Sequence, residues 1–352
     1  MSVLRPPRST ALRHAIFFLA LAVVLLAVTY LLDAFTNYNI AGIAIFAIAA
    51  AGLTVLTGIN GQLSLGHGAL MAVGAYTTSL MLKGHSDVTF AFMLLTLLVA
   101  IVTTGLAGAI IGIAAARLRG PYLAGATLAL AVGLPQLAIH FGKALGGNQG
   151  LSVPPPTPPD ALGADFPQER WLAWIAIVAA VIILFALTNL VRGPAGRTLR
   201  AVHDNETAAR LAGIDVPRVQ VFAFLISAAC AGLAGSLFAY WVGITAPTGF
   251  GLQLSLQLLS AIVIGGLGSL TGAVWGAVIL VYLPVLTSGL AGNLNLSSDI
   301  TNNLPLAVYG AVLVIAMLVF PRGIQGALTS IARAGWQWRS KTRLQQRTAE
   351  VD

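Results

Sequence analysis

The sequence has little charge and almost no cysteine. Asp, Glu, Lys and Arg together make up 9% of the 352 residues, whereas hydrophobic residues make up 57%. So few charged side chains cannot cover the surface of a soluble globule of this size. The single cysteine, Cys230, excludes an intrachain disulfide, and its place in an apolar segment favours packing as its role. The composition indicates an integral membrane protein.

Long apolar runs are what the sequence has in abundance. A helix needs about 20 mainly apolar residues to cross a bilayer, and the many glycines and alanines in these runs allow close helix packing. We predict an all-α integral membrane protein, a polytopic bundle of about ten transmembrane helices forming a single transmembrane domain over residues 1–352. The candidate spans are 14–33, 38–57, 64–82, 88–116, 121–141, 171–191, 219–242, 253–267, 272–288 and 304–320.

The positions of the basic residues predict the orientation. If the N-terminus lies in the cytoplasm, every Lys and Arg falls in a cytoplasmic segment except Lys83, Lys143 and Arg170. Basic loops resist translocation, so this asymmetry is the one that the positive-inside rule expects. We therefore expect both termini in the cytoplasm, and we interpret the net charge of +8 as a sign of topology rather than of nucleic-acid binding.

Two glycine-rich stretches, 58–68 and 265–276, interrupt the apolar runs. Ten helices with both ends on one side place the first five and the last five in opposite senses, as in transporters with 5+5 inverted halves, and each half contains one such stretch. Glycine used only for close helix packing is an equally good explanation. A broken helix within the membrane is tolerated only where protein or water covers its free backbone groups.

The cytoplasmic segment 192–218 carries a pattern typical of a short helix, which we place at 204–214. The pattern combines a capping side chain, an acid in the first turn, an i,i+4 ion pair and a glycine at the end. A structural loop is the plain alternative, but a short helix anchored between two spans also suits a surface on which a soluble motor pushes. The residues are Asp204 or Asn205 as cap, Glu206, Arg210 and Gly213.

Several motifs, taken in order, resemble the permeases of branched-chain amino-acid ABC importers. Residues 206–213 followed by 224–235 are similar to the EAA loop and succeeding helix of these permeases, and 57–68 with 74–76 resembles a segment typical of the LivM and LivH types. Across 38–325 the order of motifs matches the family, while an additional N-terminal helix within 1–37 and the chain length favour the LivM type. Further matching motifs are 146–151, 247–250 and 264–272.

The resemblance implies roles for two groups of residues. In the coupling loop 192–218, contact with a separate ATPase falls to Asp204, Glu206, Ala208, Ala209, Arg210 and Gly213. In the interrupted helices, a helix N-terminus and neighbouring side chains suit an anionic substrate group. A substrate pathway or an inner gate is implied there for Gln62, Ser64, Gly66, His67, Gly68, Gly265 and Gly266. His67 has no second metal-ligating residue at ligand spacing, so we expect no metal site.

The resemblance also implies partners. These are a second, LivH-like permease, two ATPases (LivG-like and LivF-like), a periplasmic or lipid-anchored substrate-binding protein and an amino-acid substrate, with the assembly in the bacterial inner membrane. The closest approach to a P-loop, at 335–342, has Ser340 where the second glycine is required. We therefore expect no cofactor in this chain, with ATP and Mg bound by the partner ATPases, and no enzymatic activity of its own. The basic tail, 326–352, suits anionic lipid.

Two rival functions remain open. A urea or short-chain amide ABC permease would share these motifs, and the sequence does not identify the ligand. An ion-coupled secondary transporter ordinarily has ionisable groups within the membrane, and the ten predicted spans contain almost none apart from His67 and His140 near span ends. Dependence of transport on a separate ATPase distinguishes the second rival.

Overall fold

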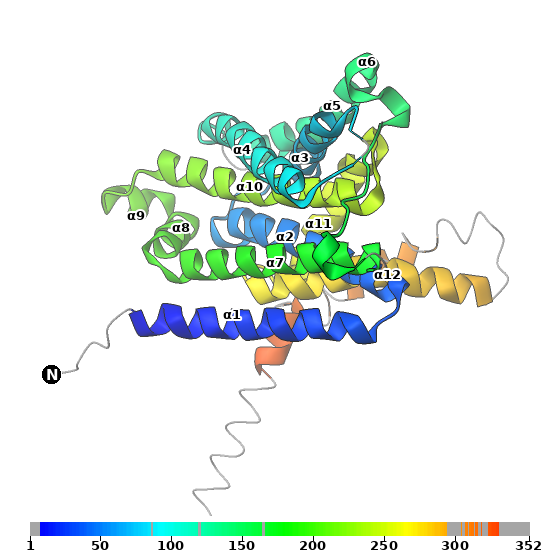
Figure 1. Cartoon of the computed structure of the whole chain (residues 1–352). Coiled ribbons are helices and arrows are strands. Elements are labelled where there is room, and N and C mark those ends of the chain that lie inside the picture. Colours follow the sequence, from blue (N-terminus) through cyan, green and yellow to red (C-terminus); the bar gives the residue numbers. More distant parts are fainter. Residues whose placement is uncertain are drawn as a thin grey trace, which may run out of the picture.

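The computed structural model describes residues 8–85, 87–118, 121–163, 166–293 and 323–330, with isolated positions between 304 and 318. Almost all of this chain is helical (Figure 1). The long helices are α1 (Arg8–Val28), α2 (Ala34–Leu53), α3 (His67–Leu82), α4 (Phe90–Ala115), α5 (Pro121–His140), α7 (Gln168–Arg192), α10 (Val216–Val242), α11 (Leu252–Gly265) and α12 (Leu270–Asn293).

The prediction of an all-α protein with several membrane-spanning helices is confirmed. Within the described residues, 8 helical segments are long and apolar enough to cross a bilayer. The predicted span 64–82 corresponds to α3, which begins at His67 and has 16 residues, so it is shorter than a full crossing. The predicted span 304–320 lies only in part within the described residues.

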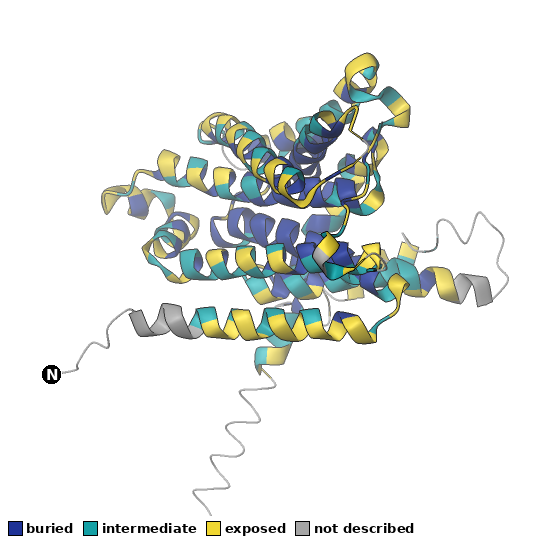
Figure 2. Cartoon of the chain, viewed as in Figure 1, coloured by how far each residue is buried: buried dark blue, intermediate teal, exposed yellow. Residues whose placement is uncertain are grey.

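Helix α2 forms the centre of the bundle and α1 its edge. In the apolar window of α2, 89% of residues are buried, against 6% in that of α1. Figure 2 shows the same contrast, with dark blue concentrated on α2 and yellow along α1. Small residues allow the close approach of helices in the core. Gly74 of α3 meets the backbone of Gly232 in α10, and Gly235 meets the backbone of Met71, so closely that neither glycine has room for a Cβ atom.

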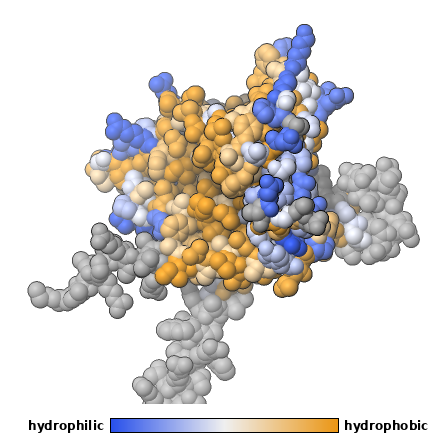
Figure 3. All heavy atoms as spheres, in the orientation of Figure 1, coloured by the Kyte–Doolittle hydropathy of each residue, from blue (hydrophilic) through white to orange (hydrophobic). Residues whose placement is uncertain are grey.

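The two ends of the bundle differ. One end carries the short helices α8 (Pro194–Asp204) and α9 (Glu206–Leu211). The other carries α6 (Gly142–Leu145) and a two-stranded antiparallel ladder, in which β1 (Leu151–Ser152) pairs with β2 (Ile244–Thr245). Figure 3 shows an apolar band on the visible face, with hydrophilic side chains gathered at both ends. This distribution suits a protein that crosses a bilayer along its helices.

The connections include several short helical turns. The 3₁₀ turns are η1 (Thr29–Leu31), η3 (Gly147–Gln149), η4 (Asp160–Leu162) and η5 (Pro247–Phe250), and η2 (Thr54–Ile59) is a π-helix that extends α2. A π-helix is rare and is frequently found at functional sites. Here it leads directly into the first glycine-rich stretch.

Candidate functional site

The first break is the non-helical segment 60–66 between η2 and α3. The chain reverses there through Gly61, whose φ of +77° is in the left-handed region that favours glycine. The backbone amide of Gln62 donates to the backbone carbonyl of Leu56 at 3.1 Å. The Thr57 hydroxyl donates to the backbone carbonyl of Gln62 at 3.0 Å. The interruption is therefore a fixed turn held by hydrogen bonds.

Neighbouring helices cover the backbone groups that this break exposes. The Leu65 amide donates to Thr127 Oγ1 of α5 at 3.0 Å, and the Gly68 amide donates to Ser255 Oγ of α11 at 3.0 Å. Gly66 has no room for a Cβ, since the Thr127 carbonyl would lie 2.9 Å from it. Helix α3 thus begins inside the bundle, where protein hydroxyls take the place of water at its free N–H groups.

The polar side chains of this stretch are buried. Gln62, Ser64 and His67 have exposures of 7%, 1% and 0%. His67 Nδ1 lies 3.5 Å from Ser227 Oγ of α10, whereas both polar atoms of the Asn60 side chain and the Gln62 side-chain oxygen have no hydrogen-bond partner among the described residues. Gln62, Ser64 and His67 are therefore enclosed by protein in this structure.

The second break lies between α11 and α12, at residues 266–269. Gly266 and Gly268 have φ of +120° and +79°, so the chain turns there in a conformation that other residues rarely adopt. Gly268 packs against Gly58 of η2, where a Cβ on Gly58 would collide with the Gly268 backbone nitrogen. The two glycine-rich stretches, about 200 positions apart in the sequence, are thus in direct contact.

Helices α8 and α9 form a compact unit at one end of the bundle. The Asn205 side chain caps α9 by accepting from the Ala208 amide at 3.0 Å. Glu206 pairs with Arg210 at 3.7 Å and accepts from the Gln220 side chain of α10 at 3.0 Å. Beneath them, an apolar cluster fixes the unit to the start of α10; its buried residues are Val202, Ala209 and Val216.

Helix α8 also contacts the first break. His203 Nδ1 lies 3.2 Å from the Ile59 carbonyl oxygen, and the His203 ring fills the space beside Gly61, where a Cβ would lie 2.7 Å from Cδ2 of the ring. A displacement of the last turn of α8 therefore either carries the first break with it or separates His203 from Ile59 and Gly61.

The predicted helix over 204–214 needs correction. The helix in this range is α9, Glu206–Leu211, which is shorter than predicted, and the extended Asn205 separates it from α8. Of the two predicted caps, Asn205 caps α9, whereas Asp204 is the last residue of α8. The predicted Glu206–Arg210 pair and the left-handed Gly213, with φ of +83°, are present. Ala208 lies in α9, and its amide donates to the Asn205 cap.

Three residues in and beside the α8–α9 unit were not predicted as site residues: His203 of α8, Leu211 of α9 and Gln220 of α10. Leu211 ends α9 with 87% of its surface exposed. Its place in the predicted cytoplasmic segment 192–218 was the available sequence signal for a contact surface. Nothing in the sequence distinguished His203 or Gln220, because their partners lie far along the chain or on another helix.

The whole chain can be compared with known families and proteins. Residues 35–317 match the family described as the branched-chain amino acid transport system permease component. The match covers most of the chain, including α2, both breaks, α8 and α9. The chain belongs to this family of permeases, and is a multi-pass membrane transport subunit rather than an enzyme.

Individual relatives support the same family assignment. The chain is 30% identical over 340 residues to the high-affinity branched-chain amino acid transport system permease protein LivM of Salmonella typhimurium, with 90% of this chain and 76% of the relative covered. It is 27% identical over 300 residues to LivH of Escherichia coli, with 80% and 91% covered. The resemblance to LivM-type permeases is confirmed. No solved structure matches the chain.

Proposed function

We propose that this chain is the LivM-type permease subunit of a bacterial ABC importer that carries leucine, isoleucine and valine. Relatives of both the LivM and LivH types match most of the chain, which supports a second permease as its neighbour in the membrane. In this proposal the chain lies in the plasma (inner) membrane with both termini in the cytoplasm, and the end bearing α8 and α9 faces the cytoplasm. The basic residues Arg192, Arg197, Arg200, Arg210 and Arg218 at that end support this orientation.

Helix α9 is the proposed contact with the ATPases. Its underside is held through Ala209 and Gln220, while Leu211 projects into solvent with 87% exposure. An exposed apolar side chain on a firmly packed helix suits a complementary apolar depression on a partner. ATP and Mg are bound and used by two partner ATPases, and this chain receives their motion.

The contact of His203 with Ile59 and Gly61 is the observation that carries the proposal. It joins the helix unit at the ATPase side to the break that the sequence indicates as pathway or gate. Movement of α8 by about the length of a hydrogen bond removes this contact and loosens the turn at Gly61. The other side of the turn rests on the second break through Gly58 and Gly268, so both breaks receive the displacement.

The proposed gate consists of the residues of both breaks. In the closed packing, Gln62, Ser64 and His67 are buried, and the Gly66 and Gly68 amides are engaged by neighbouring hydroxyls. Separation of Gly58 from Gly268, near Gly265 and Gly266, would expose these groups to a passing amino acid. A binding protein on the opposite side delivers the substrate, and the substrate shifts the equilibrium only through different affinities for the two states.

Uptake in vesicles tests the proposal. The chain is co-expressed with a LivH-type permease, two ATPases and a binding protein, reconstituted, and assayed for ATP-dependent uptake of labelled leucine and labelled urea. We expect leucine uptake that requires ATP and is lost in Glu206→Lys, which reverses the charge that holds Gln220 and Arg210. Uptake of urea alone would replace the substrate by the short-amide class, and leucine uptake without ATP would overturn the ABC mechanism in favour of an ion-coupled carrier.

A further inference from the structure

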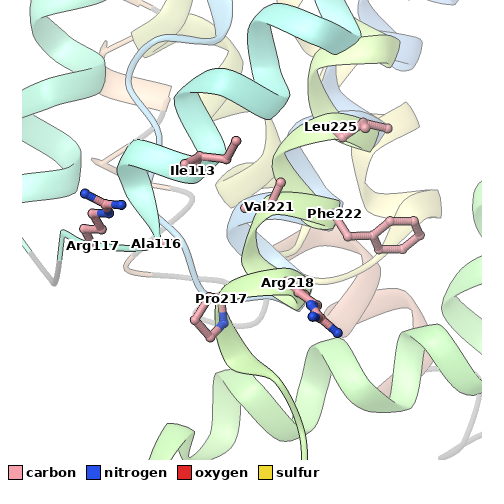
Figure 4. A pocket seen from close by; sticks show the side chains of 8 residues that line it. All are labelled: Ile113, Ala116, Arg117, Pro217, Arg218, Val221, Phe222 and Leu225. Atoms are coloured by element: carbon pink, nitrogen blue, oxygen red, sulfur yellow. The ribbon is translucent and has the colours of Figure 1, made fainter.

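A groove opens where the end of α4 meets the beginning of α10, next to the α8–α9 unit (Figure 4). Its volume is about 610 Å³. Its apolar side chains come from both helices, and two arginines stand at its rim, on opposite sides of the groove in Figure 4. The residues used below are Ile113, Val221, Phe222 and Leu225 for the apolar part, and Arg117 and Arg218 for the rim.

The apolar part continues along the surface of α4. Leu106, Ile110 and Ile113 are 60%, 70% and 55% exposed, and their spacing of four and three residues places them on one face of the helix. This face runs from the groove toward the middle of α4, within the segment that crosses the bilayer. An extended hydrocarbon chain can lie along it and enter the groove between Ile113 and Phe222.

The rim of the groove is positively charged. Arg117 has no ion-pair partner in the described part of the chain, and Arg218 pairs with Asp215 through its Nε at 2.9 Å. The Arg218 side chain remains 87% exposed, so its terminal nitrogens are accessible to a second acceptor. Two guanidinium groups and a single carboxylate leave a net positive charge at the point where the apolar surface ends.

We propose that this groove binds an anionic phospholipid, with one acyl chain along α4 and the phosphate between Arg117 and Arg218. Guanidinium groups bind phosphate oxygens through directed, charge-assisted hydrogen bonds. Basic pockets between membrane helices on the cytoplasmic side suit anionic headgroups. The combination of a lipid-facing apolar strip and a basic rim favours this occupant over an apolar protein helix, which would offer no acceptor to Arg117 or to the terminal nitrogens of Arg218. The assignment to the inner leaflet rests on the proposed orientation of the chain.

Such a lipid would touch the helix turn that supports the ATPase contact. Arg218 lies two residues before Gln220 and Val221 directly follows it, and the Gln220 side chain donates to Glu206 of α9 at 3.0 Å. A phosphate held at Arg218 therefore steadies the first turn of α10 and, through Gln220, the position of α9. We expect importers depleted of anionic lipid to hydrolyse ATP with weaker coupling to uptake.

Lipid retention by the purified importer complex tests the site. The complex is mixed in detergent with equal amounts of phosphatidylglycerol and phosphatidylethanolamine, and the lipids that remain bound are counted by native mass spectrometry. We expect retention of phosphatidylglycerol over phosphatidylethanolamine. Arg117→Gln and Arg218→Gln are each expected to weaken this retention about fivefold. Arg197→Gln removes an exposed charge from α8 that does not line the groove, and is expected to have no effect.

Two further variants separate lipid binding from misfolding. Arg117→Lys keeps the charge and is expected to keep most of the preference, while Ile113→Trp fills the groove and is expected to lower retention with both arginines present. Equal retention of the two lipids, or equal effects of Arg117→Gln and Arg197→Gln, would overturn the proposal. Loss of the second permease or of the ATPases in Ile113→Trp, with lipid retention unchanged, would identify the groove as a protein interface instead. Leucine uptake by the unmodified complex reports separately on the proposed function.

Discussion

His203 Nδ1 lies 3.2 Å from the Ile59 carbonyl oxygen, which joins the last turn of α8 to the π-helix before the first break. A carbonyl oxygen only accepts, so Nδ1 carries the proton in this contact. The two residues are separated by 144 positions in the sequence. The segment that receives motion from a partner and the segment that interrupts the membrane helices thus share one hydrogen bond and one steric contact, at Gly61.

This contact predicts an uncoupled phenotype. His203→Ala removes the hydrogen bond and the ring beside Gly61, and we expect about a fivefold fall in leucine transported per ATP hydrolysed, as for loss of about 1 kcal/mol of coupling. The measurement is simultaneous uptake and phosphate release in vesicles. His140→Ala, at an exposed histidine that ends α5, is the control. An unchanged ratio in His203→Ala would remove the contact from the mechanism.

The exposed leucine of α9 predicts a defect in assembly without a defect in folding. Leu211→Asp places a charge on a surface that is already in solvent, so we expect unfolding free energy within about 0.5 kcal/mol of the unmodified chain. Capture of the ATPases by the tagged permease is expected to fall at least tenfold, and Leu211→Met is expected to retain it. If ATPase capture survives in Leu211→Asp, the partner contacts another surface.

Two substitutions of Glu206 are expected to reduce uptake to different degrees. Its side chain accepts from Gln220 and pairs with the half-exposed Arg210, and solvent screens such an ion pair to less than about 1 kcal/mol. Glu206→Gln keeps an acceptor for Gln220, so we expect most of the uptake to remain. Glu206→Lys leaves Gln220 without an acceptor and repels Arg210, so uptake is expected to be lost. Uptake rates normalised to the amount of assembled complex provide the test, and equal losses in the two variants would argue against this hydrogen bond.

The contact between the two breaks predicts that a methyl group added at Gly58 lowers the stability of the protein. Gly58→Ala forces a Cβ against the Gly268 backbone, and overpacking of this kind costs about 1–3 kcal/mol. Gly125→Ala in α5 is the matched control, since a Cβ there meets no atom within 4 Å. We expect a lower Tm in detergent for Gly58→Ala alone. Equal Tm values for the two variants would mean that the breaks are not in firm contact.

The local sequence pattern was sufficient to predict part of the α8–α9 unit. The predicted Glu206–Arg210 pair and the terminal Gly213 are properties of neighbours along one helix, and such patterns depend little on the rest of the fold. Helix α8 was not predicted, although Pro194 at its first turn and the buried Leu199 and Val202 are typical helix signals. Its short apolar face becomes meaningful only against the bundle.

The sequence by itself determined that this protein crosses a membrane, that two glycine-rich stretches lie among its apolar runs, and that it resembles branched-chain amino-acid permeases. Composition and motif order do not depend on which helix lies beside which. Only the tertiary structure decided that Gly58 meets Gly268, that Ser255 and Thr127 satisfy the amides at the first break, and that His203 reaches Ile59. These contacts join residues far apart in the chain, and they form because the buried backbone at a helix break must find its hydrogen-bond partners inside the bundle.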